Sequence, residues 1–270
     1  MASSPRVAII YLSYKSGEYL TSAMNSLAAI GYPRDCFEIV IVDNRFPGDD
    51  SAARIKREIL PLSGQNFPSV TLLENDTNLG FAGGMNTGFR YALSKGFDYA
   101  LIVNQDAVCD PDFVAKAVSV AKADPKIGVA QCLIRLHPET ELIDSYGNEW
   151  HYLGIGWAGG YRLAVATARP SAVRDIDYAS GAAALYRLAA LGEVGLFDED
   201  FVRDQDDEFN YRLREAGFKI CFNPEIRGVY YARESFLQLA KQHFQYGFWK
   251  VRVLQKRIRM MQWRQFVPPL

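Results

Sequence analysis

The sequence predicts an α/β fold with a mostly parallel central sheet flanked by helices. The first observation is a set of short, apolar, strand-like runs at residues 7–12, 37–42, 70–74 and 99–103. The second is that helix-like segments alternate with these runs. Strands that are apolar throughout and separated by helices are typical of a parallel sheet covered on both faces.

The helices of this first half are expected at residues 17–29, 51–60, 83–94 and 112–123. Pro111 stands just before the last of these, where a proline is tolerated at a helix start. Ligands of parallel sheets bind beyond the carboxyl ends of the strands. Polar residues that directly follow the strands are therefore candidates for function.

The second half of the chain has a different sequence pattern. Residues 133–177 are poor in periodicity and rich in glycine, which favours strands and loops of a smaller mixed sheet. A strand is expected at 180–185, a helix at 188–194, a helix at 206–215 and a strand at 218–222. The pattern from residue 236 to 262 is helical, so we expect a C-terminal helical appendage.

The length and charge of the chain limit the classes of function that it can have. The chain has 270 residues, of which 49% are apolar, enough for one large α/β domain or two small ones. The net charge of −1 argues against a general nucleic-acid binder. The four cysteines are scattered and form no C-x-x-C pair, which argues against zinc and redox motifs and favours reduced thiols in the cytosol.

Charge is unevenly distributed along the chain. Residues 235–270 contain no Asp or Glu, while lysines and arginines are interleaved there with aromatic residues. A basic, aromatic-rich terminus is typical of a segment that meets an anionic membrane surface. We therefore expect a cytoplasmic protein at the inner face of the cell membrane. No run is long and apolar enough to span a bilayer.

Acidic residues crowd into one short stretch. Asp204, Asp206, Asp207 and Glu208 occupy four of five consecutive positions at the start of the helix expected at 206–215. One or two carboxylates at a helix start would be explained by capping and by the helix dipole. Four exceed that need and suit a general base or a cation site.

Two strand ends also carry acids. Asp43 follows the strand at 37–42, and Asp106 follows the strand at 99–103. Either carboxylate alone could simply belong to a turn. Asp106 could instead hold a hard cation that shares phosphate oxygens with a substrate.

A glycine-rich segment, N-L-G-F-A-G-G-M-N-T-G at residues 78–88, connects the third strand to a helix. Glycines there would let the backbone approach a ligand, and the helix start would favour an anion. The spacing fits neither the dinucleotide fingerprint nor the P-loop. The combination of acids at strand ends, a glycine-rich turn and an acidic helix start suits a nucleotide held with a divalent cation beside a general base.

These residues resemble the family 2 glycosyltransferases of the GT-A fold, and within them the rhamnosyltransferase and succinoglycan-biosynthesis type. The resemblance runs from about residue 7 to residue 247, with the motifs in the family's order. They are S-Y-K at 13–15, I-V-D-N at 41–44, the glycine-rich segment at 78–88, N-Q-D at the D-x-D position 104–106, S-G-A at 180–182 and Q-D-D-E at 205–208.

The resemblance implies a GT-A domain over residues 1–234, with a Rossmann-like nucleotide-sugar-binding half at 1–130 and an acceptor-binding half at 131–234. It implies inverting transfer of a sugar from a UDP, GDP or dTDP donor to a hydroxyl of a glycan or lipid-linked acceptor, in polysaccharide or cell-envelope glycan synthesis. Asp206 would be the general base, and Asp106 would bind Mn²⁺ or Mg²⁺. The nucleotide-binding residues would be Ser13, Tyr14, Asp43, Asn78, Gly80, Asn86, Asn104 and Gln105. The acceptor-binding residues, some of which would orient Asp206, would be Ser180, Gly181, Asp207, Glu208 and Arg212.

The chain departs from the family pattern at three places. Asn104 replaces the first Asp of D-x-D, Gln205 replaces the first acid of the later motif, and residues 228–233 lack the histidine that many relatives use as a metal ligand. Two alternatives stay open. One is a nucleotidyltransferase that makes a nucleotide-sugar, although residues 12–17 lack its glycine-rich loop. The other is an inactive glycan- or lipid-binding relative.

Overall fold

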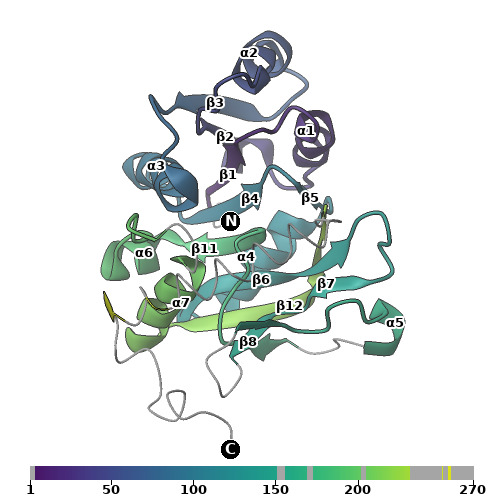
Figure 1. Ribbon diagram of the computed structural model, residues 1–270, viewed down its shortest axis with the longest axis vertical. Helices are drawn as coiled ribbons and strands as arrows, with labels where there is room; N and C mark the ends of the chain where they lie inside the picture. Colours follow the sequence, from purple (N-terminus) through teal and green to yellow (C-terminus); the bar gives the residue numbers. More distant parts are fainter. Residues whose placement is uncertain are drawn as a thin grey trace, which may run out of the picture.

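The computed structural model describes residues 4–150, 156–168, 173–201, 205–231, 251, 255 and 256, and its main feature is one large twisted sheet between helices (Figure 1). Asp204 lies outside the described residues. So does the expected C-terminal appendage at 235–270, apart from residues 251, 255 and 256.

The predicted parallel sheet is confirmed in the first half of the chain. The strands β1 (Val7–Ser13), β2 (Phe37–Asp43), β3 (Ser69–Glu74) and β4 (Tyr99–Asn104) lie in the order β4-β1-β2-β3 and run parallel. The register places Ser13 beside Asp43, and Leu12 beside Asn104. The carboxyl ends of neighbouring strands therefore meet at one edge of the sheet.

The strands of the second half extend the same sheet. β11 (Ala183–Arg187) lies antiparallel between β4 and β6 (Ile127–Leu136), and β12 (Lys219–Tyr230) runs parallel to β6. The short strands β5 (Ala107–Cys109), β7 (Ile143–Ser145) and β10 (Arg174–Asp175) join this sheet. Only β8 (Asn148–Trp150) and β9 (Gly156–Ala158) form a separate pair among the described strands. The smaller mixed sheet expected for the acceptor side is thus mostly a continuation of the main sheet.

Helices cover both faces. α1 (Leu20–Ala28) and α4 (Phe113–Ala123) bury their apolar sides in one core, whereas α3 (Gly80–Ser94), α6 (Leu188–Val194) and α7 (Gln205–Glu215) share the other. Figure 1 shows α3, α6 and α7 in a row along the same side of the sheet. This row joins the glycine-rich segment to the acidic helix.

Some predicted boundaries shift. The helix expected at 17–29 begins at Leu20, because a turn from Ser16 to Tyr19 precedes it. The helix expected at 51–60 is short at α2 (Ser51–Arg54) and continues as a π-helical turn (Ile55–Ile59) and a 3₁₀ turn (Leu60–Leu62). The smaller elements are a 3₁₀ turn (Arg34–Cys36) and α5 (Val165–Ala168). Across the described part of the chain, no helix is both long and apolar enough to cross a bilayer.

The glycine-rich segment is helical, which corrects its interpretation as a loop that approaches a ligand. α3 begins at Gly80, which has φ of +70°, and Gly84 and Gly88 lie inside the helix. A Cβ on Gly84 would lie 2.5 Å from Leu12 Cδ1, and one on Gly88 would overlap Ile10. These glycines let the helix pack closely on β1, a requirement that the sequence pattern alone did not distinguish from ligand approach.

Candidate active site

Three predicted residues meet at the carboxyl edge of the sheet. Ser13, Asp43 and Asn104 end the adjacent strands β1, β2 and β4. The Ser13 and Ser16 hydroxyls are hydrogen-bonded at 2.7 Å and buried. Burial raises the pKa of Asp43, and the charges of Glu74 and Asp49 raise it further. A carboxyl held in this way accepts or shares a proton more readily than a solvated one.

Asn44, which was not among the predicted site residues, organises the start of α3. Its side chain is 2% exposed and donates to Asn78 Oδ1 at 3.1 Å and to the Gly80 carbonyl at 2.8 Å. Its own oxygen accepts the Leu79 amide at 3.0 Å. Asn78 and Gly80 are therefore brought to the sheet edge by Asn44. The sequence signal was present in the pair 43–44, but Asn44 looked equivalent to a turn residue.

Tyr14 contributes to an aromatic group above the strand ends. Its ring packs edge-on against Phe46 at a centroid distance of 5.3 Å. The Lys15 ammonium lies over the Phe46 ring at 4.1 Å. Aromatic faces and a cation beside the ends of β1 and β2 suit a flat, anionic ligand.

The donor edge and the S-G-A segment touch. The backbone amide of Asn104 donates to the Ala182 carbonyl at 3.0 Å. The backbone amide of Ser180 donates to Gln131 Oε1 at 2.7 Å. A Cβ on Gly181 would lie 3.1 Å from the Phe81 ring. Ser180 therefore lies against β6 and Gly181 against α3, next to the Ala182 carbonyl that bonds to β4. Gln131, buried inside β6, is a positioning residue that sequence reasoning missed.

Asp106 lies in the turn between β4 and β5, preceded by the partly exposed Gln105. Its carbonyl accepts the Tyr231 amide at 2.9 Å, which ties the turn to the end of β12. Burial raises the pKa of Asp144, in β7, to about 6, and the charge of Asp106 contributes to the rise. Asp144 was not among the predicted site residues.

The proposed base sits at the start of α7. Asp206 is partly exposed, its Oδ1 accepts the Asp207 amide at 3.1 Å, and its carbonyl accepts the Asn210 side chain at 2.7 Å. Burial raises the pKa of Tyr186 in β11, and the charge of Asp206 adds to this effect. Asp206 is thus an accessible carboxylate above a buried aromatic core, whereas Asp207 is 5% exposed.

Glu208 and Arg212, which were predicted to line the acceptor side or to orient Asp206, form an internal ion pair. Glu208 is fully buried, and its carboxylate accepts two hydrogen bonds from Arg212, at 2.8 and 2.9 Å. Arg212 also donates to the carbonyls of Val194 and Leu196. The pair anchors α7 to the segment after α6. A role in orienting Asp206 is consistent with this geometry.

Asn86, predicted to bind the nucleotide, is held by internal hydrogen bonds. It is 1% exposed, and its amide is hydrogen-bonded to the backbone of Phe197 and to Glu199. Asn86 therefore positions the segment that precedes α7. Sequence reasoning could not find this partner because it lies more than a hundred positions away.

The segment from Asn104 to Asp106 carries oxygen atoms that could serve as ligands of a divalent cation. Asn104 Oδ1 is buried and accepts no hydrogen bond from the described residues. An amide oxygen of this kind and the nearby carboxylate of Asp106 are the donor types that Mg²⁺ and Mn²⁺ accept. The described residues contain no cluster of three or more His, Cys, Asp or Glu side chains that could hold a metal ion by themselves. His137 stacks on Tyr231 at 3.9 Å, and His151 and His243 lie outside the described part of the chain.

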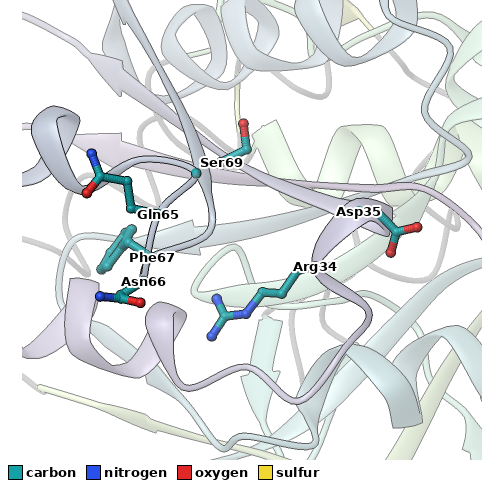
Figure 2. Close-up of a pocket in the computed structure, with 7 residues that line it drawn as sticks. Arg34, Asp35, Gln65, Asn66, Phe67 and Ser69 are labelled. Atoms are coloured by element: carbon teal, nitrogen blue, oxygen red, sulfur yellow. The ribbon is translucent and has the colours of Figure 1, made fainter.

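A shallow pocket lies elsewhere. A cavity of about 300 Å³ is lined by residues of the turn before β2 and of the loop before β3, among them Arg34, Gln65 and Phe67. Figure 2 shows Gln65, Asn66 and Phe67 together on that loop. These residues precede the strands, so the cavity is at the amino edge of the sheet. It contains none of the predicted site residues.

The fold and the site together define a class: a GT-A-type α/β protein with a polar site at the carboxyl edge of its sheet. The chain belongs to the glycosyltransferase-like family 2, whose model matches residues 5–247. The fold is also that of a mannosyltransferase, PcManGT, from Pyrobaculum calidifontis, solved with GDP-Man and Mn²⁺. That structure aligns with a TM-score of 0.67 and 21% identity over 95% of this chain and 65% of that chain.

Two curated relatives are similar in sequence. The succinoglycan biosynthesis protein ExoA of Rhizobium meliloti is 36% identical over 85 residues, 32% of this chain and 26% of ExoA. The N-acetylglucosaminyl-diphospho-decaprenol L-rhamnosyltransferase of Mycobacterium tuberculosis is 24% identical over 84% of this chain and 76% of that protein. The chain thus matches about a quarter of ExoA and just under two thirds of the mannosyltransferase.

Proposed function

We propose that the chain is an inverting, metal-dependent glycosyltransferase. It would move a sugar from a nucleoside-diphosphate donor to a hydroxyl group of a glycan or lipid-linked acceptor. The observation that carries the proposal is the contact between Asn104 and Ala182, which joins the donor edge of the sheet to the S-G-A segment. The rhamnosyltransferase relative, by its name, acts on a lipid-linked acceptor, and PcManGT was solved with a nucleotide-sugar.

The donor half would hold the nucleotide at the strand ends. Ser13, Asp43 and Asn78 lie along this edge, and Tyr14 with Phe46 offers an aromatic surface beside it. Asn104 ends the neighbouring strand β4, and Gln105 and Asp106 follow it, where the diphosphate would lie. A divalent ion held by Asp106 would stabilise the charge that develops on the departing diphosphate.

The acceptor half would supply the base. Asp206 is accessible at the first turn of α7, and it would remove the proton of the acceptor hydroxyl as that oxygen attacks the anomeric carbon. The bond from that carbon to the diphosphate breaks in the same displacement, so the configuration inverts. Asp207, Ser180 and Gly181 remain the proposed acceptor-side residues, while Glu208 and Arg212 hold the helix that carries the base.

Transfer from a panel of UDP-, GDP- and dTDP-sugars to a polyprenyl-diphosphate sugar, with Mn²⁺ or Mg²⁺, tests the proposal. Asp206→Asn should lower kcat by about 10²–10⁴-fold, the usual contribution of a general base. Donor affinity, measured by calorimetry, should not change. Glu215→Gln, on the same helix and exposed, is the matched control. Unaltered turnover in Asp206→Asn rejects the base, and nucleotide-sugar synthesis from a sugar phosphate would favour the nucleotidyltransferase.

We also propose that residues 235–270 bring the acceptor side to an anionic membrane at its inner face. Lys256 forms ion pairs with Asp198, at 2.9 Å, and with Asp200, both on the segment before α7. A basic segment attached there would place lipid-linked acceptors near Asp206. Flotation with anionic and neutral vesicles tests the idea, and equal recovery with both would reject it.

A further inference from the structure

Tyr231 follows directly on β12, in the half of the chain proposed to bind the acceptor, and its backbone holds the turn that carries Asp106. The backbone amide of Tyr231 donates to the Asp106 carbonyl at 2.9 Å. The antiparallel ladder between β5 and β12 ends on the pair of Ala107 with Tyr230. The turn between β4 and β5 is therefore bonded to the end of β12, and Tyr231 supplies the bond to Asp106 itself.

The side chain of Tyr231 contacts two other aromatic rings. It stacks on His137, which follows β6, at a centroid distance of 3.9 Å and an interplanar angle of 25°. It also packs against Tyr19, which precedes α1, at a centroid distance of 5.2 Å. Aromatic rings in contact stabilise a structure beyond the apolar area that they bury. The ends of β6 and β12 and the start of α1 therefore meet at Tyr231.

Tyr19 connects this aromatic group to the end of β1. Its backbone amide donates to the Ser16 carbonyl at 2.9 Å, and the Ser16 hydroxyl is hydrogen-bonded to that of Ser13 at 2.7 Å. Tyr231 thus contacts the segment after β1 through its ring and the segment after β4 through its amide. Both segments belong to the proposed nucleotide-binding half, residues 1–130, whereas Tyr231 belongs to the other half.

We propose that Tyr231 is a positioning residue for the donor site, and that it holds the segments at 13–19 and 104–106 in one arrangement. This inference rests on the proposed function. The two segments follow adjacent strands, β1 and β4. A nucleoside diphosphate that contacts both segments binds more tightly when they are already held in place. Donor binding therefore depends on a ring from the acceptor-binding half.

Calorimetry with UDP, GDP and dTDP in the presence of Mn²⁺ measures this dependence. Tyr231→Ala keeps the backbone amide but removes the ring contacts with His137 and Tyr19, so it should weaken nucleotide binding by about tenfold. Tyr231→Phe keeps the ring and should bind within about twofold of the unaltered chain. Tyr161→Ala removes a tyrosine that is 51% exposed; it is the matched control and should not change the affinity.

Hydrogen exchange followed by mass spectrometry supplies a readout that needs no nucleotide. Tyr231→Ala should exchange faster than the unaltered chain at residues 16–19 and 104–109, because these segments lose their shared contact. Tyr231→Phe should exchange at the rate of the unaltered chain. His137→Ala removes an exposed ring of the stack and should show both changes to a smaller degree, which keeps the test open if Tyr231→Ala does not fold.

Unaltered nucleotide affinity in Tyr231→Ala overturns the inference, even where exchange is faster, because Tyr231 would then support the fold alone. If Tyr231→Ala does not fold, unaltered affinity in His137→Ala overturns it instead. Equal weakening in Tyr231→Ala and Tyr231→Phe also overturns it, since the ring would not be the group that acts. If the unaltered chain binds none of these nucleotides, the proposed function fails, and hydrogen exchange alone decides whether Tyr231 holds the two segments.

Discussion

Asn86 and Phe197, 111 positions apart, are joined by two hydrogen bonds. The Phe197 amide donates to Asn86 Oδ1 at 3.0 Å, and Asn86 Nδ2 donates to the Phe197 carbonyl at 2.8 Å. Glu199 accepts from Asn86 at 2.9 Å and from Arg90 at 2.7 Å. A side chain of α3 thus fixes the segment that leads into α7. Helix α3 borders the proposed donor site, and α7 carries the proposed base.

Removing this link should destabilise the fold. Asn86→Ala leaves the buried amide and carbonyl of Phe197 without partners, which should lower the free energy of unfolding by about 1–3 kcal/mol. Denaturation in urea, followed by circular dichroism, measures the change. Asn66→Ala, in an exposed loop, is the control and should stay within about 0.5 kcal/mol. Equal losses in the two variants would contradict a bonding role for Asn86.

Replacing either of two helical glycines by alanine should change the stability of the fold, but in opposite directions. Gly88→Ala would drive a Cβ into Ile10 of β1, so we expect a loss of about 1–3 kcal/mol, typical of overpacking. Gly192→Ala, in α6, meets no atom within 4 Å. It should stabilise by about 0.4–1 kcal/mol because alanine restricts the unfolded chain. Thermal melts of both variants check the sign, and a stable Gly88→Ala would show that α3 does not pack so closely on β1.

The buried Glu208–Arg212 pair should be costly to break. Arg212→Ala leaves a carboxylate with no exposed surface beside two carbonyls that have lost their donor. Breaking a buried pair in this way typically costs about 3–5 kcal/mol. Lys116→Ala removes a surface pair of the same i,i+4 spacing and should cost no more than about 0.5 kcal/mol. Denaturant midpoints compare the two variants, and a small loss in Arg212→Ala would mean that water reaches Glu208.

Replacing Asp43 by Asn should change the stability of the fold by an amount that depends on pH. Its pKa in the folded protein is raised above the ordinary 3.8, chiefly by burial. The folded state therefore binds this proton more tightly than the unfolded chain, and Asp43 lowers stability once the pH exceeds its folded pKa. Asp43→Asn should be more stable than the unaltered chain at pH 7 in EDTA.

That advantage should shrink as the pH falls toward 3, where Asp43 is protonated in both the folded and the unfolded chain. Melting temperatures at pH 3, 5 and 7 would show it, with Asp112→Asn as a solvated control. A gain that is independent of pH would contradict the assignment. The same variant should bind nucleotide more weakly, because the proposed site would lose a charged acceptor.

The sequence predicted best what depends on short-range patterns. Apolar runs located the parallel strands, so the placement of Asp43 and Asn104 at one sheet edge followed from strand order alone. It did not show the internal hydrogen bonds of three predicted site residues, Asn86, Glu208 and Arg212. Asn86 has its partners more than a hundred positions away, where no local pattern can indicate them. Glu208 and Arg212 have the spacing of a helical ion pair, but their residue types fit a binding site equally well.

The pairing of β11 between β4 and β6 has a mechanical consequence. Five residues of β11, Ala183 to Arg187, are registered against Val103 to Tyr99 of β4. The proposed nucleotide-binding and acceptor-binding halves therefore share one continuous sheet. Separating them would break a ladder of backbone hydrogen bonds worth about 1 kcal/mol each. Under the proposed function, donor loading and product release would therefore depend on loops at the edge of the sheet, and the motion of these loops, rather than a hinge between the halves, would limit the rate.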